Sequence, residues 1–530
     1  MWNIDRGDVD QVAAWEDFSP TGVRDRIERL STFAEQATAD DSTVDAEGKS
    51  LLAAVGFSAQ ASAALLPFER DLSMVAAPFN LVTFLSVLVP AYALTTSEHG
   101  HGYVTKLTSL PSFIEGWIAG LRDGVTAGRV ATRRGVDQLV VGIDSMLARD
   151  ISDDPLLTQS PPSEMSSVEV DQWRSSVSTA IGDDVRPALA GLRAILVEEL
   201  LPAGRSDDAA GVCHLVDGDA AYQSLLAAAT STDLTPDEVH ELGLERLALI
   251  DDEYAILGRA VLGVADPGVV RERLRDDESL RYDTAEEIIA DAMAALGRAE
   301  AAAPGWFNRM PRASCRAVAT ESGSMAFYTG PSPDGARSGT FFFKTGDPRS
   351  WTRYQLEVTT FHESVPGHHL QVALAQELDL HPVVGELEVT SYSEGWGLYA
   401  ERLADEMGLY SSELQRLGML TLDSLRAARL VVDTGLHARG WSRQAAIDFL
   451  VTTTTLEPSN AENEIDRYIA TPGQATSYMV GRLEIERLRA IAQRHQQQHF
   501  TIQAFHDIVL NAGMSPLFDV ARRVDEWINP

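Results

Sequence analysis

Cysteine is nearly absent from this 530-residue chain, which contains only Cys213 and Cys315. Two cysteines this far apart form neither a disulfide framework nor a CxxC motif. A metal site in this protein must therefore be built from histidine and carboxylate side chains. Scarce cysteine fits a reducing compartment, and the first ten residues lack the basic start and apolar core of a secretory signal. We therefore expect a cytoplasmic protein.

Basic residues are also few, because 43 lysines and arginines stand against 78 acidic residues, for a net charge of −35. Such a surface repels the phosphates of nucleic acids and anionic lipids. We therefore expect no nucleic-acid partner. The one long uncharged run, residues 73–97, contains Pro78 and Pro90 and has acidic flanks. These features favour a buried core helix over a membrane span, so we expect no membrane partner.

Helix signals dominate the rest of the chain. Residues 235–238 read Thr-Pro-Asp-Glu, a capping box with proline at the first helical position, and open a segment through Leu257. Residues 284–302 are rich in strong helix formers, and apolar residues recur at helical spacing from Leu422. Loops are expected at 150–167 and 202–219. Without βαβ alternation, a phosphate-binding loop or repeats, the pattern predicts a mainly α protein.

One clear strand is predicted at residues 339–344, GTFFFK, after a turn-rich stretch at 328–335. Its edge could pair with an extended peptide, and Tyr328 and Arg337 are candidate substrate-binding residues beside it. Asp347 and Pro348 then read as the N-cap and first position of a helix. We expect this helix to carry the chemistry, with a small sheet beside it.

The chemistry is suggested by residues 361–371, which read FHESVPGHHLQ. In zinc hydrolases two imidazoles bind Zn²⁺, and a glutamate between them takes a proton from water. His362 and Glu363 fit these roles, with His368 as the second ligand. Six residues of straight helix span about 9 Å, too far for one ion, so Pro366 and the glycine after it must break the helix. His369 is the alternative second ligand.

A third protein ligand is expected on the helical segment 391–406, which carries Glu394 and Glu401. Glu394 follows His368 by 26 residues, an interval at which many zinc hydrolases supply a glutamate from the next helix. Glu401 lies on the same helical face and is a candidate to orient a ligand. The alternative is a chance His-Glu pair at the end of a helix. We expect one Zn²⁺ per chain, held by His362, His368 and Glu394.

Asp433 and His437 lie four residues apart on one predicted helical face. An aspartate in this position can orient a histidine, which then donates to a developing oxyanion. His437 is therefore a candidate catalytic residue. A buried structural pair near the end of the helix is the alternative.

Five blocks in the C-terminal part of the chain resemble the bacterial family named domain of unknown function 885. In order they read HESVPGHHLQ, EGWGLYAERL, RAARLVVDTGLHARGW, EIDRYIATPGQATSYMVGRL and FHDIVLNAGMSPL. The N-terminal 300 residues resemble the family only loosely. The family is grouped with the gluzincin peptidases and is similar in plan to thimet-type oligopeptidases and angiotensin-converting enzyme. The resemblance implies a helical, two-lobed body around a deep channel, with a peptidase-like zinc site.

The resemblance also implies functional residues near the C-terminus, where related peptidases place a tyrosine or histidine that stabilises the tetrahedral intermediate. Tyr478 is the candidate, because a phenol donates a hydrogen bond without adding charge. Tyr468 and Gln474 are candidate substrate-binding residues around the same Pro-Gly turn. We expect a helical N-terminal lobe over residues 1–300 and a catalytic lobe over 301–530, intertwined as one fold.

These observations predict an enzyme, a zinc-dependent metallopeptidase acting on peptides or related amides. One alternative is hydrolysis of a non-peptide amide or ester at the same site. Another is a non-catalytic helical binding protein that keeps a degenerate metal site. Metal content and peptide turnover together separate the three.

Overall fold

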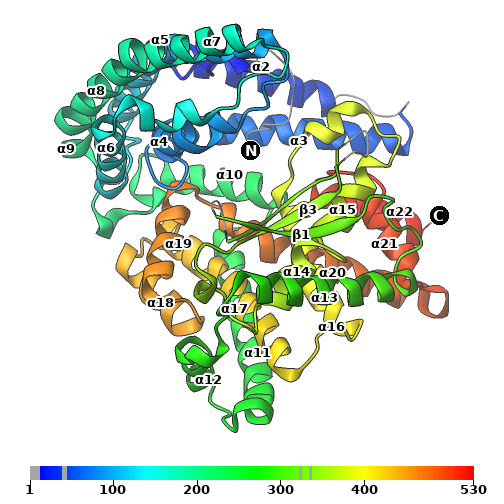
Figure 1. The fold of residues 1–530 in the computed structure, drawn as a ribbon. Coiled ribbons are helices and arrows are strands. Elements are labelled where there is room, and N and C mark those ends of the chain that lie inside the picture. Colours follow the sequence, from blue (N-terminus) through cyan, green and yellow to red (C-terminus); the bar gives the residue numbers. More distant parts are fainter. Residues whose placement is uncertain (1–11, 39–43, 322–324, 333–336, 530) are drawn as a thin grey trace.

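The structure is a computed structural model that describes residues 12–38, 44–321, 325–332 and 337–529. Helices make up most of this chain, and the described residues form one small sheet (Figure 1). The predicted mainly α fold class with a small sheet is therefore confirmed.

The N-terminal helices share their own apolar core, in which Trp117, Leu139 and Leu192 are buried. They form the blue-to-green layer of Figure 1. Their bounds are α2 (Pro20–Thr38), α3 (Ala46–Phe68), α4 (Leu81–Thr83), α5 (Ser97–Thr126), α6 (Arg133–Ala148), α7 (Ser167–Ala180), α8 (Arg186–Ile195) and α9 (Leu201–Ala203).

The remaining helices build a second and larger apolar core around α17, which is buried over most of its length. Their bounds are α10 (Gly218–Thr230), α11 (Pro236–Leu262), α12 (Pro267–Asp276), α13 (Ala285–Ala302), α14 (Leu356–Glu363), α15 (His368–Gln376), α16 (Thr390–Glu406), α17 (Glu413–His437), α18 (Arg443–Thr453), α19 (Pro458–Ala470), α20 (Ser477–Gln496), α21 (Ile502–Leu510) and α22 (Leu517–Ile528). Along the chain, the first core gives way to the second between residues 210 and 222. The lobe boundary predicted from the sequence lies at residue 300. That division, and a channel between lobes, stay predictions.

The sheet consists of β1 (Cys315–Thr320), β2 (Ala326–Thr329) and β3 (Gly339–Lys344), in the order β1-β3-β2. The strand predicted at 339–344 is therefore confirmed. It runs parallel to β1 and antiparallel to β2. Because β3 is the central strand, both of its edges are already paired, and the prediction that it binds a peptide by edge pairing is wrong.

Helix starts were largely predictable from local chemistry. Thr235 and Glu238 form a capping box at the start of α11, and Thr284 caps α13. Asp347, by contrast, caps only a short 3₁₀ turn, and the helix with the metal motif begins at Leu356. The prediction of a helix from Pro348 is wrong because the chain becomes extended at Trp351 and forms a β-bridge between Thr352 and Arg281.

The uncharged run at residues 73–97 is not one helix. It contains turns and bends around Pro78, then α4, a π-helical turn at Phe84–Leu88 and a 3₁₀ turn at Val89–Ala91, and Leu81, Leu85 and Val89 are fully buried. The run is therefore buried as expected, but the expected core helix is broken at the prolines. Among the described residues, one helical stretch, Ala46–Ser73, is long and apolar enough to cross a membrane by length and composition alone.

Candidate metal centre

The metal motif lies at a sharp break between two helices. α14 ends at Glu363 and α15 begins at His368, so Pro366 and Gly367 interrupt the helix as predicted. A side chain on Gly367 would place its Cβ 1.9 Å from the carbonyl oxygen of His362, so only glycine allows this close approach. The indole of Trp396 donates a 3.0 Å hydrogen bond to the Pro366 carbonyl and ties the break to α16.

The break brings three metal-binding side chains together. His362, His368 and Glu394 offer ligand atoms that all lie within 4.8 Å of one another. The Glu394 Oε2 atom is 3.4 Å from Nε2 of His362 and 3.6 Å from Nε2 of His368. Neighbouring ligand atoms around a tetrahedral zinc with bonds of about 2.0–2.1 Å lie roughly 3.3 Å apart. The donor set and its spacing therefore fit Zn²⁺.

Glu401 fixes the orientation of His362. Its carboxylate lies 2.8 Å from Nδ1 of His362 and is almost fully buried, at 3% side-chain exposure. This carboxylate accepts the proton on Nδ1 and leaves Nε2 facing Glu394, where it can bind a metal once it gives up its own proton. On the other face of the ring, a Cβ at Gly397 would be only 2.5 Å from Cε1 of His362. The ring is therefore clamped between a carboxylate and the backbone of α16.

The structure decides between the two adjacent histidines. His369 is buried, and its two ring nitrogens contact the Tyr328 hydroxyl at 2.8 Å and the Ala313 carbonyl at 3.0 Å. Burial is the main cause that lowers the pKa of His369, to about 4. His369 is thus a neutral structural residue that joins α15 to the sheet. His368, and not His369, lies with His362 and Glu394 in the group that could hold a metal ion.

Charge pairing holds the cluster together. Burial by itself would lower the pKa of His362, but Glu394 and Glu401 outweigh it and raise the pKa to about 10. Burial would raise the pKa of Glu394, but His362 and His368 outweigh it and hold the pKa well below its usual range. The cluster therefore pairs an ionised carboxylate with a protonated imidazole, and a divalent cation bound here would replace that proton.

Glu363 is half-buried beside these ligands. Among the described residues its carboxylate has no hydrogen-bond partner. Burial raises its pKa, while the imidazoles of His362 and His368 and the guanidinium of Arg426 act in the opposite direction. A carboxylate that is unengaged and has a raised pKa is suited to accept a proton.

Tyr478 comes to the same place through a close helix crossing. A Cβ at Gly395 would be 2.6 Å from the backbone of Gly481, and one at Gly481 would be 1.9 Å from the Ser391 carbonyl. α16 and α20 therefore touch along their backbones next to Glu394. Burial and the nearby Glu394 carboxylate both raise the pKa of Tyr478, which is half-buried. Within the described part of the chain its hydroxyl has no hydrogen-bond partner.

His437 is not available for the role predicted for it. It is fully buried, accepts a 3.1 Å hydrogen bond from the Val212 amide at Nδ1 and lies 3.1 Å from the Tyr468 carbonyl at Nε2. Burial lowers its pKa to about 3. Asp433 does not orient it, because this carboxylate accepts from Tyr222 at 2.6 Å and from the Gly473 amide at 2.9 Å. The predicted catalytic assignment of His437 is therefore wrong.

The other candidate substrate residues have mixed outcomes. Tyr468 is fully buried, and its hydroxyl bonds to Glu464 and Arg429, so a direct contact with substrate is contradicted. Gln474 is half-buried and accepts a 2.7 Å hydrogen bond from Arg467. Tyr328 is engaged with His369. Arg337 acts electrostatically on Tyr328, and the substrate role of both residues stays a prediction.

Two arginines of α17, Arg426 and Arg429, were not identified from the sequence. Both lie in the block RAARLVV, on a helix that is otherwise deeply buried. Charged residues are almost never fully buried unless they are paired. Two arginines three positions apart within an apolar helix are therefore a signal that could have found them.

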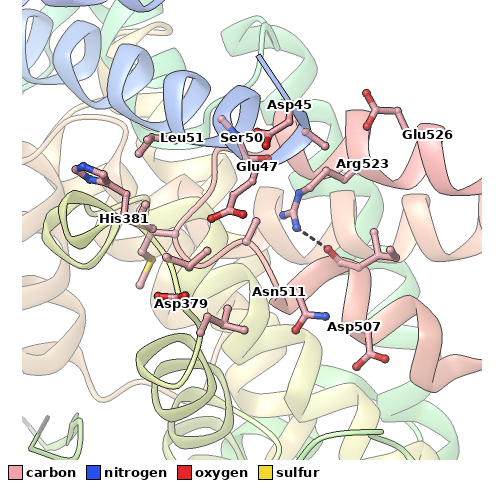
Figure 2. Close-up of a pocket in the computed structure, with 18 of the residues that line it drawn as sticks. Asp45, Glu47, Ser50, Leu51, Asp379, His381, Asp507, Asn511, Arg523 and Glu526 are labelled. Carbon is pink, nitrogen blue, oxygen red and sulfur yellow. Dashed lines mark hydrogen bonds between the residues drawn. The ribbon is translucent and has the colours of Figure 1, made fainter. Parts of the chain in front are cut away.

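Two surface cavities lie away from this cluster. One of about 910 Å³ is lined by residues of α3, α21 and α22 and by Asp379 and His381 (Figure 2). Its Arg523 donates to the Ile508 carbonyl at 2.7 Å. The other, of about 1210 Å³, lies between α3, α10, α11, α20 and α22. Neither cavity is lined by His362, His368 or Glu394.

The chain belongs to the family described as "Bacterial protein of unknown function (DUF885)", which it matches over residues 1–524. The crystal structure of a candidate lipoprotein from Colwellia psychrerythraea is similar, with a TM-score of 0.89, 22% identity, and coverage of 98% of this chain and 93% of that chain. The structure of a candidate lipoprotein of unknown function from Shewanella oneidensis has a TM-score of 0.72, 14% identity, and coverage of 96% and 94%. These likenesses support the fold. A comparison with curated proteins gives no match.

The comparisons correct one expectation. The predicted cytoplasmic location is contradicted, because both similar structures are described as lipoproteins, which are membrane-anchored and extracytoplasmic. Scarce cysteine does not identify a compartment by itself. The first ten residues, which lack the pattern of a secretory signal, lie outside the described part of the chain.

Proposed function

We propose that this protein is a zinc-dependent metallohydrolase of the gluzincin type that cleaves peptides or related amides. The observation that carries the proposal is the convergence of His362, His368 and Glu394 within 4.8 Å, with the unengaged carboxylate of Glu363 beside them. Zinc, when bound by these three residues, supplies Lewis acidity toward a carbonyl oxygen and toward water.

The chain's own residues supply proton transfer and charge stabilisation. Glu363 accepts the proton of the attacking water and passes it to the leaving amine, a role for which its raised pKa suits it. The Tyr478 hydroxyl donates a hydrogen bond to the oxygen on which negative charge develops. Glu401 holds His362 in the orientation that the ligand set needs.

A mixed peptide library, incubated with and without a metal chelator, tests this proposal together with the Glu363→Gln variant. We expect hydrolysis that the chelator abolishes. Glu363→Gln should keep its metal and lose about 100- to 10,000-fold in turnover, because an amide cannot accept the proton. The exposed residue His499 provides a matched control, and His499→Ala should behave as wild type. Wild-type turnover in Glu363→Gln would exclude this mechanism.

A further inference from the structure

A second group of charges adjoins the metal centre, on α17 and α19. Arg426 and Arg429 lie three residues apart on α17, so they share one face of that helix. The guanidinium carbon of Arg429 is 4.8 Å from the centroid of the Tyr478 ring. Glu394 and both arginines also act electrostatically on Tyr478.

The positive charges of this group exceed the negative ones. Arg429 and Arg467 both pair with a single carboxylate, Glu464, at 2.9 and 3.0 Å. Arg429 has only 9% side-chain exposure, and its Nη1 atom has no hydrogen-bond partner. Arg426 makes no hydrogen bond or ion pair with any described residue, and its Nε atom is buried. The protein as a whole has a net charge of −35, so this excess of positive charge is a local feature of the group.

Both arginines belong to the surroundings of the proposed catalytic groups. Arg429 lies against the ring of Tyr478, and the charge of Arg426 acts on both Glu363 and Tyr478. A buried donor without a partner costs free energy, and a buried charge costs more. Proteins keep such groups where a ligand completes them. The partner must supply acceptor oxygens, because guanidinium groups only donate, and the excess of positive charge favours an anion.

We propose that Arg426 and Arg429 form a carboxylate-binding subsite of this protein, adjoining Tyr478 and the metal centre. The planar fork of a guanidinium matches the two oxygens of a carboxylate. The peptide nature of the ligand rests on the proposed function, whereas binding of a carboxylate does not. Two sources share this chemistry, the C-terminal carboxylate of a peptide and an acidic side chain. A terminal carboxylate here would restrict cleavage to bonds near the C-terminus.

Calorimetric titration of three small probes into zinc-loaded Glu363→Gln protein tests the subsite without turnover. The probes are N-acetyl-Ala-Ala, its C-terminal amide, and the amide of N-acetyl-Glu-Ala, whose only carboxylate is in the side chain. We expect the free acid to bind about 10- to 100-fold more tightly than its amide, as for one or two charge-assisted hydrogen bonds. The third probe identifies the source of the carboxylate. An affinity like that of the free acid indicates an acidic side chain, and an affinity like that of the amide indicates a C-terminal carboxylate.

Substitution identifies the residues. Arg426→Gln should remove most of the preference for the acid while leaving the fold intact, because its guanidinium has no partner to lose. Arg426→Lys should restore part of the preference by charge alone. Arg416→Gln, on the same helix but paired with Asp405 at the surface, is the matched control and should keep the full preference. Equal binding of acid and amide by the parent protein overturns the proposal, as does an unchanged preference in both Arg426→Gln and Arg429→Gln.

Titration and turnover separate this inference from the proposed function. A carboxylate preference that depends on Arg426, in a protein that hydrolyses no peptide, upholds the subsite and refutes the peptidase. Hydrolysis of peptide acids and amides at equal efficiency, with equal binding of the probes, upholds the peptidase and refutes the subsite.

Discussion

The region around His362 and the region around His437 are built from the same residue types and use them in opposite ways. Each combines a buried histidine with a buried carboxylate on a helix of the larger core. At His362 the neighbours are the carboxylates Glu394 and Glu401, which raise the pKa of the imidazole against the effect of burial. At His437 the neighbours are backbone groups, and burial lowers the pKa to about 3.

The two histidines differ in whether a ring nitrogen remains available to bind a metal. Both ring nitrogens of His437 are used by backbone groups of Val212 and Tyr468, so this ring joins three segments of the fold. His506 is similar, since Tyr399 and the Trp306 carbonyl occupy its nitrogens. At His362 only Nδ1 is fixed by a second residue, and Nε2 points at an ionised carboxylate that a cation can share. The chemistry of the partners, and not burial, therefore distinguishes the proposed metal ligand His362 from the structural histidines His437 and His506.

The largest effect that would sharpen this contrast is expected at Tyr478. Tyr478→Phe removes only the hydroxyl, which has no partner among the described residues, so folding and zinc content should be kept. Loss of one donor to a developing oxyanion lowers turnover by about 100- to 1000-fold. Steady-state kinetics should show a lower kcat with little change in KM. A Phe variant with wild-type kcat would remove Tyr478 from the mechanism.

A smaller effect is expected at Glu401, which acts through His362. Glu401→Gln keeps the shape of the side chain but weakens its hold on Nδ1. Such changes beside a ligand typically weaken metal affinity by about 10- to 100-fold. Competition with a chelator of known zinc affinity measures this directly. Glu406→Gln, one turn further along α16 and paired with Arg489 near the surface, is the control that should bind zinc as wild type does. Equal affinity in the two variants would contradict the role of Glu401.

The smallest effect is expected at Asp433 and concerns stability, not catalysis. Burial raises the pKa of this carboxyl to about 7, compared with about 3.9 in an unfolded chain. Between these values the folded state holds a proton that the unfolded state has lost. The free energy of unfolding should therefore fall as the pH rises from 4 to 7, by at most about 1.4 kcal/mol per pH unit from this group.

Urea denaturation at several pH values measures that contribution. In Asp433→Asn the difference from wild type should shrink between pH 4 and 7 and then become constant. Turnover should change little, because Asp433 bonds to Tyr222 and Gly473 and not to the ligand cluster. A large loss of zinc in this variant would show that the two regions are coupled and would break the comparison.

The sequence predicted those parts of the site whose chemistry is local. His362, Glu363 and His368 belong to one short motif. Pro366 and Gly367 in the same motif predict the helix break that brings the two imidazoles together. The helix start at Thr235 was equally visible, because a cap is decided by side chains within one turn.

Features decided by distant segments were not predictable. His437 has the expected helical spacing from Asp433, but the Val212 amide that occupies it comes from 225 residues away. His369 could not be separated from His368 until the fold placed Tyr328 and Ala313 against it. The surplus of positive charge around Arg429 depends on Glu464 being shared with Arg467, which only the packing of α17 against α19 establishes.

The most direct test of the account is the zinc content of purified protein, measured by elemental analysis in matched histidine variants. We predict one zinc per chain in the wild type, in His369→Gln and in the exposed-site control His499→Ala. His362→Ala and His368→Ala should retain little zinc while keeping the helical circular dichroism of the wild type. Full occupancy in either of these two variants, or loss of zinc in a folded His369→Gln, would contradict the ligand set.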